Sequence, residues 1–237
     1  MPSIVAVDIG GTHARFALAE VAGGTVVSLA PELTLKTVEY ASFALAWRAF
    51  VATLGGSPPR AAAIAIAAPV DGETIELTNN PWVIRPATLA AELGIDDFLL
   101  VNDFGAVAHA VVAVGPEHLR HICGPDAPLP ASGVISVVGP GTGLGVAQIL
   151  RDEHGLHVIE TEGGHIDFAP LDSIEDAILA ALRRRYARVS AERIVSGPGL
   201  VEIHDALAGI EGRAAAPREA KALWTAALAG GDPHAAA

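Results

Sequence analysis

The sequence has few cysteines and few basic residues. Its single cysteine, Cys123, excludes an intramolecular disulfide and a zinc site built from cysteines. Of the 237 residues, 15 are Lys or Arg and 27 are Asp or Glu, which gives a net charge of −12. The longest basic run is Arg183–Arg185. Nucleic acids and anionic membranes bind proteins through a basic face, so we expect neither as a partner.

Long apolar runs are also missing. The opening residues Met1–Ser3 carry no basic side chain, and the apolar stretch Ile4–Val7 is too short for the core of a signal peptide. No run comes near the roughly 20 apolar residues that span a bilayer. With 51% hydrophobic and 18% charged residues, the chain is expected to be a globular cytoplasmic protein with one large domain or two smaller ones.

The order of apolar runs and turn residues predicts a mixed α/β fold, with parallel strands joined through helices. Glycine turns separate three antiparallel strands at the start. After the Pro- and Gly-rich residues 124–133 the pattern partly restarts, which indicates two halves of one architecture facing each other. The expected strands are 3–8, 13–19, 25–35, 61–67, 98–101, 134–138, 144–150 and 157–160, and the expected helices are 42–54, 86–93, 106–114, 174–186, 191–195, 199–207 and 218–228.

The apolar run from Phe98 to Val101 ends abruptly in Asn102-Asp103. We interpret it as a buried central strand whose carboxyl end opens into a cleft, where open α/β sheets place their ligands. A carboxylate there can act as a general base, and the neighbouring amide can bond a hydroxyl of the same substrate. An Asx turn in which Asp103 caps the following helix explains the pair equally well.

Two glycine-rich turns follow buried strands, one in each half of the chain: Gly10–Thr12 and Gly141–Gly143. Glycines let backbone N–H groups approach a phosphate closely, and threonine adds a hydroxyl donor. The carboxylate of Asp8, before the first turn, could hold Mg²⁺ through water. Either turn alone is an ordinary hairpin, and the first is not a Walker loop, because the Lys-Ser/Thr is missing. As a pair, the two turns predict a site in which a chain of phosphate groups is bound from both sides of a cleft.

The segment Glu162–His165 places a carboxylate and an imidazole beside a flexible turn. Carboxylates accept hydrogen bonds from hydroxyl groups, and imidazole donates or accepts, so hydroxyl recognition is one interpretation and a solvated loop is the other. A metal site is disfavoured because a third ligand is missing nearby. Glu192 falls in the first turn of a helix that Ser190 is expected to cap. The polar loop Thr78–Trp82 either offers its tryptophan to a sugar or buries it in the core.

Five segments, in chain order, resemble the bacterial glucokinases: DIGGTHAR, NDFGAVAHA, GPGTGLGVA, EGGHIDFAP and SAERIVSGPGL. This family belongs to the superfamily of sugar kinases, heat-shock ATPases and actin, whose members have two ribonuclease-H-like domains around an interdomain cleft. The resemblance covers essentially the whole chain. It implies a smaller N-terminal domain, residues 1–112, with the first phosphate hairpin and the catalytic Asp. It also implies a larger domain, residues 113–237, with the second hairpin and the sugar-binding loops.

The resemblance further implies ATP-dependent phosphorylation of D-glucose to glucose 6-phosphate, a step of glycolysis. Asp103 is similar to the base that takes the proton from the 6-hydroxyl of glucose. Another hexose kinase and a non-catalytic sugar or nucleotide sensor are the alternatives, and a homodimer is left open. The implied glucose contacts are Asn102, Asp103, Glu162, His165 and Glu192, and the implied ATP phosphate contacts are Asp8, Gly10, Gly11, Thr12, Gly141, Thr142 and Gly143, with Mg²⁺ held through water by Asp8.

The sequence departs from the family in two ways. His13 stands where many members have Asn, so no side-chain phosphate contact is assigned to it. Members of the family continue beyond the last residue of this chain, through helices and a Gly-Gly turn that holds adenosine. The second domain is therefore expected to be incomplete, and the chain to bind ATP poorly and to turn over slowly or not at all.

Overall fold

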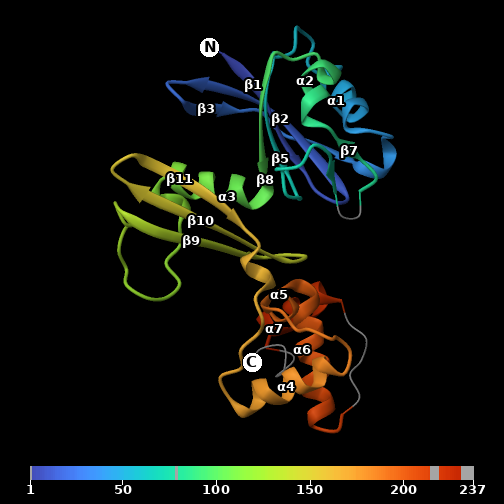
Figure 1. The fold of residues 1–237 in the computed structure, drawn as a ribbon, viewed down its shortest axis with the longest axis vertical. Helices are drawn as coiled ribbons and strands as arrows, with labels where there is room; N and C mark the ends of the chain where they lie inside the picture. Colours follow the sequence, from blue (N-terminus) through green and yellow to red (C-terminus); the bar gives the residue numbers. More distant parts are fainter. Residues whose placement is uncertain (1, 78–79, 214–218, 231–237) are drawn as a thin grey trace. The chain divides into compact units, whose positions relative to one another are not determined.

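The structure is a computed structural model, drawn as a ribbon in Figure 1. It describes residues 2–77, 80–213 and 219–230. Thr78 and Asn79 of the predicted polar loop lie outside the described residues, as does the end of the chain after Gly230.

The chain divides into two compact units, Met1–His118 and Leu119–Ala237. The expected boundary after residue 112 falls near the end of helix α3 (Asp103–Ala113), which lies in the first unit. Within the part of the chain that the structure describes, no helix is both long and apolar enough to cross a membrane. Cys123 is exposed at the start of the second unit.

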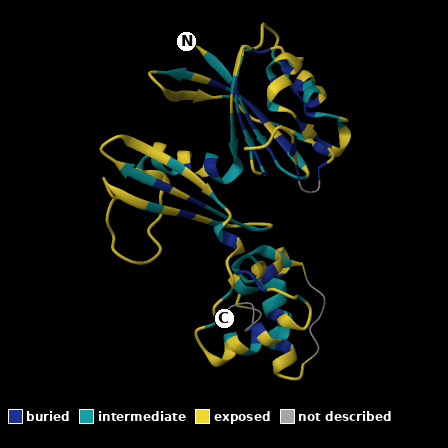
Figure 2. Ribbon diagram, in the orientation of Figure 1, coloured by how far each residue is buried: buried dark blue, intermediate teal, exposed yellow. Residues whose placement is uncertain are grey.

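The first unit is built on a six-stranded mixed sheet with the order β3-β2-β1-β5-β8, in which β4 also pairs with β2. The first three strands are antiparallel neighbours, as the sequence predicts, whereas β1, β5 and β8 run parallel. The strand expected over 25–35 is two strands, and the first of them, β3, is exposed along its length (Figure 2). The strands are β1 (Ser3–Ile9), β2 (His13–Ala22), β3 (Thr25–Leu29), β4 (Leu33–Lys36), β5 (Ala61–Ile66) and β8 (Asp97–Asn102).

The parallel strands of this sheet end along one edge. Ile9 of β1 lies opposite Ile66 of β5, and Ile66 lies opposite Asn102 of β8. The first glycine turn and the Asn102 segment therefore both begin at the carboxyl edge of the sheet, where open α/β sheets bind ligands. However, β8 is the outermost described strand and not the central strand that was predicted. Its apolar run suggested burial on both faces, but Leu99 is 59% exposed.

Helices α1 (Phe43–Val51) and α2 (Pro86–Leu93) pack on one face of this sheet (Figure 1). The α1 helix begins after Ser42, whose hydroxyl accepts a hydrogen bond in the first turn, and it buries its aromatic face. Phe16 of β2 stacks on Phe50 of α1 with ring centroids 5.3 Å apart. The short elements of the unit are η1 (Thr37–Glu39), β6 (Ile75–Glu76), β7 (Val83–Ile84) and η2 (Pro116–His118).

Trp82 belongs to the core of the first unit. Its side chain is 1% exposed and lies beside the ring of Phe43. The indole N–H donates to the carbonyl oxygen of Tyr40 at 2.8 Å, which satisfies its only polar group. Of the two alternatives for this residue, the structure therefore supports the core and not a platform for a sugar.

The second unit combines a three-stranded antiparallel sheet, in the order β11-β10-β9, with a group of helices. This meander has the same order as β3-β2-β1, in agreement with the repeated pattern of the sequence. A separate apolar cluster forms where Leu179 and Leu182 meet Val189. The elements are β9 (Gly133–Pro140), β10 (Leu144–Asp152), β11 (Gly155–Thr161), η3 (Gly163–His165), α4 (Ser173–Arg183), α5 (Ala191–Ile194), α6 (Gly197–Ile210) and α7 (Ala220–Leu228).

Candidate active site

The turn Gly10–Thr12 joins β1 to β2, and its three carbonyl groups are bonded to the protein. The Gly10 carbonyl oxygen accepts from the side-chain amide of Asn80 at 3.1 Å. Those of Gly11 and Thr12 accept from the hydroxyl and the N–H of Thr37, at 3.1 and 3.0 Å. In a trans peptide the N–H points opposite to the C=O. The N–H groups of Gly11 and Thr12 therefore point away from these partners, an arrangement that can bind an anion.

Thr37 and Asn80 were missed by the sequence analysis as parts of this turn. They are buried, with 2% and 8% of their surface exposed, and Asn80 also accepts from the Trp82 N–H at 3.0 Å. Their partners in the turn are far away in the sequence, so no local spacing connects them. The one signal is an amide beside a large aromatic residue in a polar loop.

Asp8 forms an ion pair across the first hairpin. Its Oδ2 accepts from Arg15 Nη1 at 2.6 Å, directly opposite in the β1–β2 register, and Arg15 Nε lies 3.9 Å from Glu32 Oε1. These residues border a hollow of about 370 Å³ whose floor is largely alanine and valine. The described residues contain no group of three or more His, Cys, Asp or Glu that could hold a metal ion. A lone carboxylate still fits Mg²⁺, because that ion commonly takes one or two carboxylates together with phosphate oxygens.

His13 follows the same turn at the start of β2. Its Nδ1 lies 2.9 Å from the hydroxyl of Thr12, within hydrogen-bonding distance. The Gly10 N–H donates to the His13 carbonyl oxygen at 2.9 Å, which closes the turn. His13 therefore supports the geometry of the hairpin through both its ring and its backbone.

Asn102, and not Asp103, is the cap of α3. The Asn102 side-chain oxygen accepts from the N–H groups of Phe104 and Gly105 at 2.9 and 3.3 Å. Its Nδ2 donates to the Ala68 carbonyl oxygen at 3.3 Å. The expected Asx turn is present, but it is centred one residue earlier, because Asp103 has already entered the helix.

Asp103 is consequently the first residue of α3, at the carboxyl edge of the sheet. Its Oδ1 accepts from the Phe104 N–H at 2.8 Å. The first turn of a helix favours a negatively charged side chain, because the N–H groups there carry partial positive charge. The local fold thus holds a carboxylate at the position where the sequence predicted a general base.

The second glycine turn, Gly141–Gly143, joins β9 to β10 and is held from two sides. The Gly141 N–H donates to the Gly143 carbonyl oxygen at 2.8 Å, and the Gly141 carbonyl oxygen accepts from the Gly197 N–H at 2.8 Å. After the turn, the Leu144 N–H donates to Glu192 Oε2 at 2.9 Å. Residues of α5 and α6 therefore fix both ends of the turn.

Glu162, His165 and Glu192 form one cluster in the second unit. His165 Nε2 lies 3.5 Å from Glu162 Oε2, and His165 Nδ1 lies 3.9 Å from Glu192 Oε1. Arg188 bonds the His165 carbonyl oxygen and so fixes the backbone of η3. The resemblance to glucokinases implied all three as glucose contacts, and their geometry offers acceptors and a donor to a polyhydroxylated molecule.

Ser190 stands at the N-cap of α5, but its side chain makes no capping hydrogen bond, contrary to expectation. Ser190 is buried and forms a β-bridge with Asp167. Glu192 lies in the first turn as predicted. Its side chain reaches towards β10 and not back to the helix start.

Two glycines allow the close contacts of this cluster. A Cβ on Gly164 would collide with the carbonyl group of Leu144, and one on Gly143 would collide with the Glu192 carboxylate. The absence of these side chains lets η3 and α5 approach the start of β10. The obstacle at Gly164 is backbone, which explains glycine at that position, whereas the Glu192 carboxylate beside Gly143 is the end of a flexible side chain.

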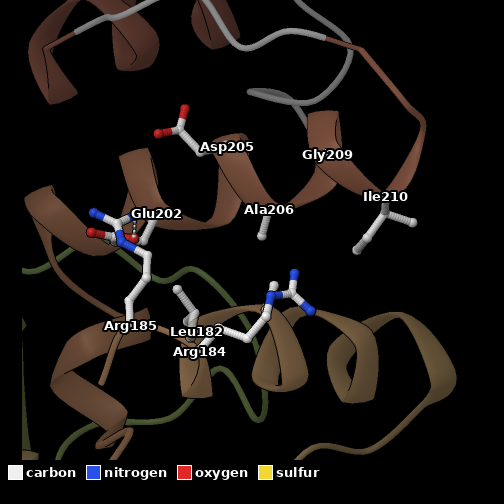
Figure 3. Close-up of a pocket in the computed structure, with 9 residues that line it drawn as sticks. Leu182, Arg184, Arg185, Glu202, Asp205, Ala206, Gly209 and Ile210 are labelled. Carbon is white, nitrogen blue, oxygen red and sulfur yellow. Dashed lines mark hydrogen bonds and ion pairs between the residues drawn. The ribbon is translucent and has the colours of Figure 1, made fainter. Parts of the chain in front are cut away.

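A separate hollow of about 290 Å³ lies between α4 and α6 (Figure 3). Leu182 and Ala206 face it, Arg185 pairs with Glu202 at one end, and Ile210 borders the other. It contains none of the predicted site residues. We therefore assign the candidate site to the glycine turns and the carboxylates beside them and not to this hollow.

The predicted residues thus fall into two groups, one in each unit. The first unit brings Asp8 and the turn Gly10–Thr12 to the same sheet edge as Asn102 and Asp103. The second unit brings the turn Gly141–Gly143 into contact with Glu192, in the cluster of Glu192 with Glu162 and His165.

Comparisons with known proteins agree on one family. The family model described as glucokinase matches residues 5–237. The glucokinase of Zymomonas mobilis is 62% identical over 229 residues, which are 97% of this chain and 71% of that relative. The glucokinase of Saccharophagus degradans is 38% identical over 231 residues, with 98% and 71% covered.

Solved structures give the same result. A glucokinase from an Antarctic psychrotroph superposes with a TM-score of 0.84 at 29% identity, covering all of this chain (100%) and 73% of that one. A glucokinase from Balamuthia mandrillaris, solved in complex with glucose, has a TM-score of 0.75 at 22% identity, with 99% and 71% covered. The second match, at this low identity, supports the fold alone. The chain thus spans a little over 70% of the length of these relatives.

Proposed function

The chain belongs to the glucokinase family, and on this basis we propose that it transfers the terminal phosphoryl group of ATP to the 6-hydroxyl of D-glucose. The observation that carries the proposal is the position of Asp103, a carboxylate held at the first residue of α3 on the same sheet edge as the Gly10–Thr12 turn. A base and a phosphate-binding turn are the parts that phosphoryl transfer to an alcohol needs.

In this proposal Asp103 accepts the proton of the glucose 6-hydroxyl while the oxygen of that hydroxyl attacks the γ-phosphorus of ATP. The bond between this phosphorus and the β–γ bridging oxygen breaks, and ADP leaves. The general base must be fixed relative to the hydroxyl, since a displaced base loses most of its effect. Asn102 supplies that fixation by capping α3 and by bonding Ala68. The side-chain amide of Asn102 can also contact a sugar hydroxyl.

The two glycine turns are proposed to bind the phosphate groups of ATP. In the first turn, Thr37 and Asn80 hold the carbonyl groups, so the N–H groups of Gly11 and Thr12 are presented on the other side. In the second turn, Gly141–Gly143, the Gly141 N–H closes the turn, and the N–H groups of Thr142 and Gly143 and the exposed hydroxyl of Thr142 are proposed to contact phosphate. Backbone N–H groups of such turns are suited to phosphate because they donate without the cost of a mobile side chain.

Mg²⁺ is proposed to arrive with ATP and to be held through water by Asp8. When bound, the ion would neutralise phosphate charge during transfer of the phosphoryl group. Arg15 keeps the Asp8 carboxylate in place by bonding one of its oxygens. The same guanidinium brings positive charge to this end of the first hairpin.

Glu162, His165 and Glu192 are proposed to bind sugar hydroxyls and so to select the substrate. A site built of hydroxyl-binding groups rejects a molecule that lacks the matching hydroxyl, because its own polar groups are left unpaired. This supports glucose over hexoses with a changed hydroxyl at the contacted positions.

A coupled assay for glucose 6-phosphate tests the proposal directly. The expected result is slow product formation that requires both glucose and ATP and that stops when Mg²⁺ is removed by a chelator. Binding of glucose and ATP without any product would instead identify the chain as a sensor. If another hexose is turned over faster than glucose, that hexose is the substrate in place of glucose.

A further inference from the structure

One side chain of the second unit joins the proposed sugar site to the proposed phosphate turn. Glu192 Oε2 accepts from the Leu144 N–H at 2.9 Å, and Glu192 Oε1 faces His165 Nδ1 at 3.9 Å. The Glu192 side chain is 32% exposed, against 69% for Glu162. Glu192 is therefore held by the fold, whereas Glu162 extends into solvent.

Leu144 is the residue directly after the turn Gly141–Gly143, so its N–H marks the end of that turn. The other end is held by the Gly197 N–H, which donates to the Gly141 carbonyl oxygen. The contact with Gly197 is between backbone groups and uses no side chain of the sugar cluster. The contact with Glu192 is the one that a bound sugar can influence, because it uses a carboxylate of that cluster.

We infer that Glu192 is a positioning residue for the phosphate turn as well as a sugar contact, and that it couples glucose binding to ATP binding. This inference rests on the proposed function. A sugar hydroxyl that bonds Oε1 restricts the carboxylate to one orientation. The other oxygen then holds the Leu144 N–H, and the turn is fixed before ATP arrives.

The coupling has a simple thermodynamic basis. A turn that is already ordered costs less free energy to occupy, so the first ligand raises the affinity for the second. Such coupling is reciprocal: glucose raises the affinity for ATP by the same factor as ATP raises the affinity for glucose. Typical factors between coupled sites are about 5-fold to 150-fold.

Three variants separate the two roles of Glu192. Glu192→Gln keeps a carbonyl oxygen that can accept from the Leu144 N–H but loses the charge towards the sugar. Glu192→Ala removes both functions. Glu162→Gln, the matched control, changes a carboxylate of the same cluster that no described contact joins to the turn.

The measurements are the KM values for both substrates and calorimetric ATP binding with and without glucose. All three variants should raise the KM for glucose. Only Glu192→Ala should also raise the KM for ATP, by about 5-fold or more, and make ATP affinity independent of glucose. Glu192→Gln should keep the KM for ATP near that of the unmodified chain.

The inference is overturned if ATP affinity in the unmodified chain does not depend on glucose. It is equally overturned if Glu192→Ala and Glu162→Gln have the same KM for ATP. Either result leaves the proposed function intact, provided that glucose 6-phosphate is formed. Glucose-dependent ATP binding without product formation would support the coupling and refute the proposed function. Equal melting temperatures of the Glu192 variants exclude a general loss of folding as the cause.

Discussion

The hydroxyl of Thr37 donates to the carbonyl oxygen of Gly11 at 3.1 Å, although 26 positions separate the two residues. The backbone N–H of Thr37 also bonds the next carbonyl, that of Thr12. One buried residue thus orients two successive peptide groups of the first phosphate turn.

Thr37→Val removes the hydroxyl while keeping the shape of the side chain. The Gly11 carbonyl then loses a partner, so we expect the KM for ATP to rise several-fold and the free energy of unfolding to fall by about 1 kcal/mol. The KM for glucose should stay the same. Thr37→Ser, which keeps the hydroxyl, is the control and should resemble the unmodified chain. Steady-state kinetics and urea unfolding measure both effects, and equal ATP kinetics of the two variants would contradict the role of Thr37.

Asp103→Asn removes the proposed base but keeps the size of the side chain. We expect kcat to fall about 10²-fold or more, the range for a lost general base, while glucose binding changes only a few-fold. The coupled assay and glucose calorimetry measure the two quantities. Asp126→Asn, which changes an exposed carboxylate outside both residue groups, should leave kcat unchanged. A kcat near that of the unmodified chain in Asp103→Asn would exclude this residue as the base.

Asn102→Ala removes the cap of α3, whose oxygen accepts from Phe104 and Gly105. The free energy of unfolding should fall by about 1 kcal/mol, the usual cost of a lost N-cap. Asn102→Ser keeps a capping oxygen and should lose less stability. If Asn102 also binds sugar, both variants should raise the KM for glucose. Urea unfolding of the pair checks the cap, and equal stabilities of the two variants would argue against it.

Glu162→Gln should act mainly on sugar affinity, because Glu162 lies beside His165 in the proposed hydroxyl-binding cluster. We expect a higher KM for glucose with a smaller effect on kcat. Deoxy sugars lacking a contacted hydroxyl should be poor substrates, since unpaired polar groups in the site are costly. Glu153→Gln, in the exposed turn after β10, is the matched control. Equal efficiency with glucose and every deoxy analogue would reject the cluster as the sugar site.

Tyr186→Phe tests a hydrogen bond that should depend on pH. The Tyr186 hydroxyl donates to Glu202 Oε1 at 2.7 Å, and this bond, with burial, raises the pKa of Tyr186 above its ordinary value of 10.0. The folded state therefore holds the proton more tightly than the unfolded state does. The contribution of this hydrogen bond to the free energy of unfolding is therefore full below the pKa of Tyr186 in the unfolded state. It is lost as the pH rises through the pKa in the folded state.

We therefore expect Tyr186→Phe to lower the free energy of unfolding by about 1 kcal/mol at pH 8, with the difference shrinking above about pH 10. The phenylalanine ring still accepts the contact with Arg193, whose guanidinium lies 4.0 Å from the ring centroid. Urea unfolding of Tyr186→Phe and of the unmodified chain, measured from pH 8 to above about pH 10, provides the comparison. A difference that stays constant at high pH would show that the hydroxyl bond is not its source.

Much of the fold could be predicted because local patterns decide it. The glycine turns and alternating residues gave the meander of β1, β2 and β3, and Ser42 marked the start of α1. The prediction that β8 is a central strand was wrong, because an apolar run does not reveal whether a strand has a second neighbour. The prediction placed the cap of α3 one residue too late, at Asp103 instead of Asn102, because Asn and Asp are both good caps.

The sequence predicted the motifs of the candidate site one by one, but it did not predict the hydrogen bonds that connect these motifs to other segments. No spacing rule links Thr37 and Asn80 to the first turn, because these contacts form only when distant segments pack together. The same holds for Glu192 and the Leu144 N–H. Sequence motifs identified groups that can touch a substrate, whereas the residues that orient those groups became visible only in three dimensions.

Cys123 offers an experimental consequence of its own. Because it is the single cysteine and is exposed, a maleimide dye would attach at one defined position of the second unit without removal of any native thiol. A second cysteine placed at Ser28, exposed on β3, would carry the partner dye on the first unit. Energy transfer between the two fluorophores would then report, in solution and in real time, how glucose and ATP change the separation of the labelled positions.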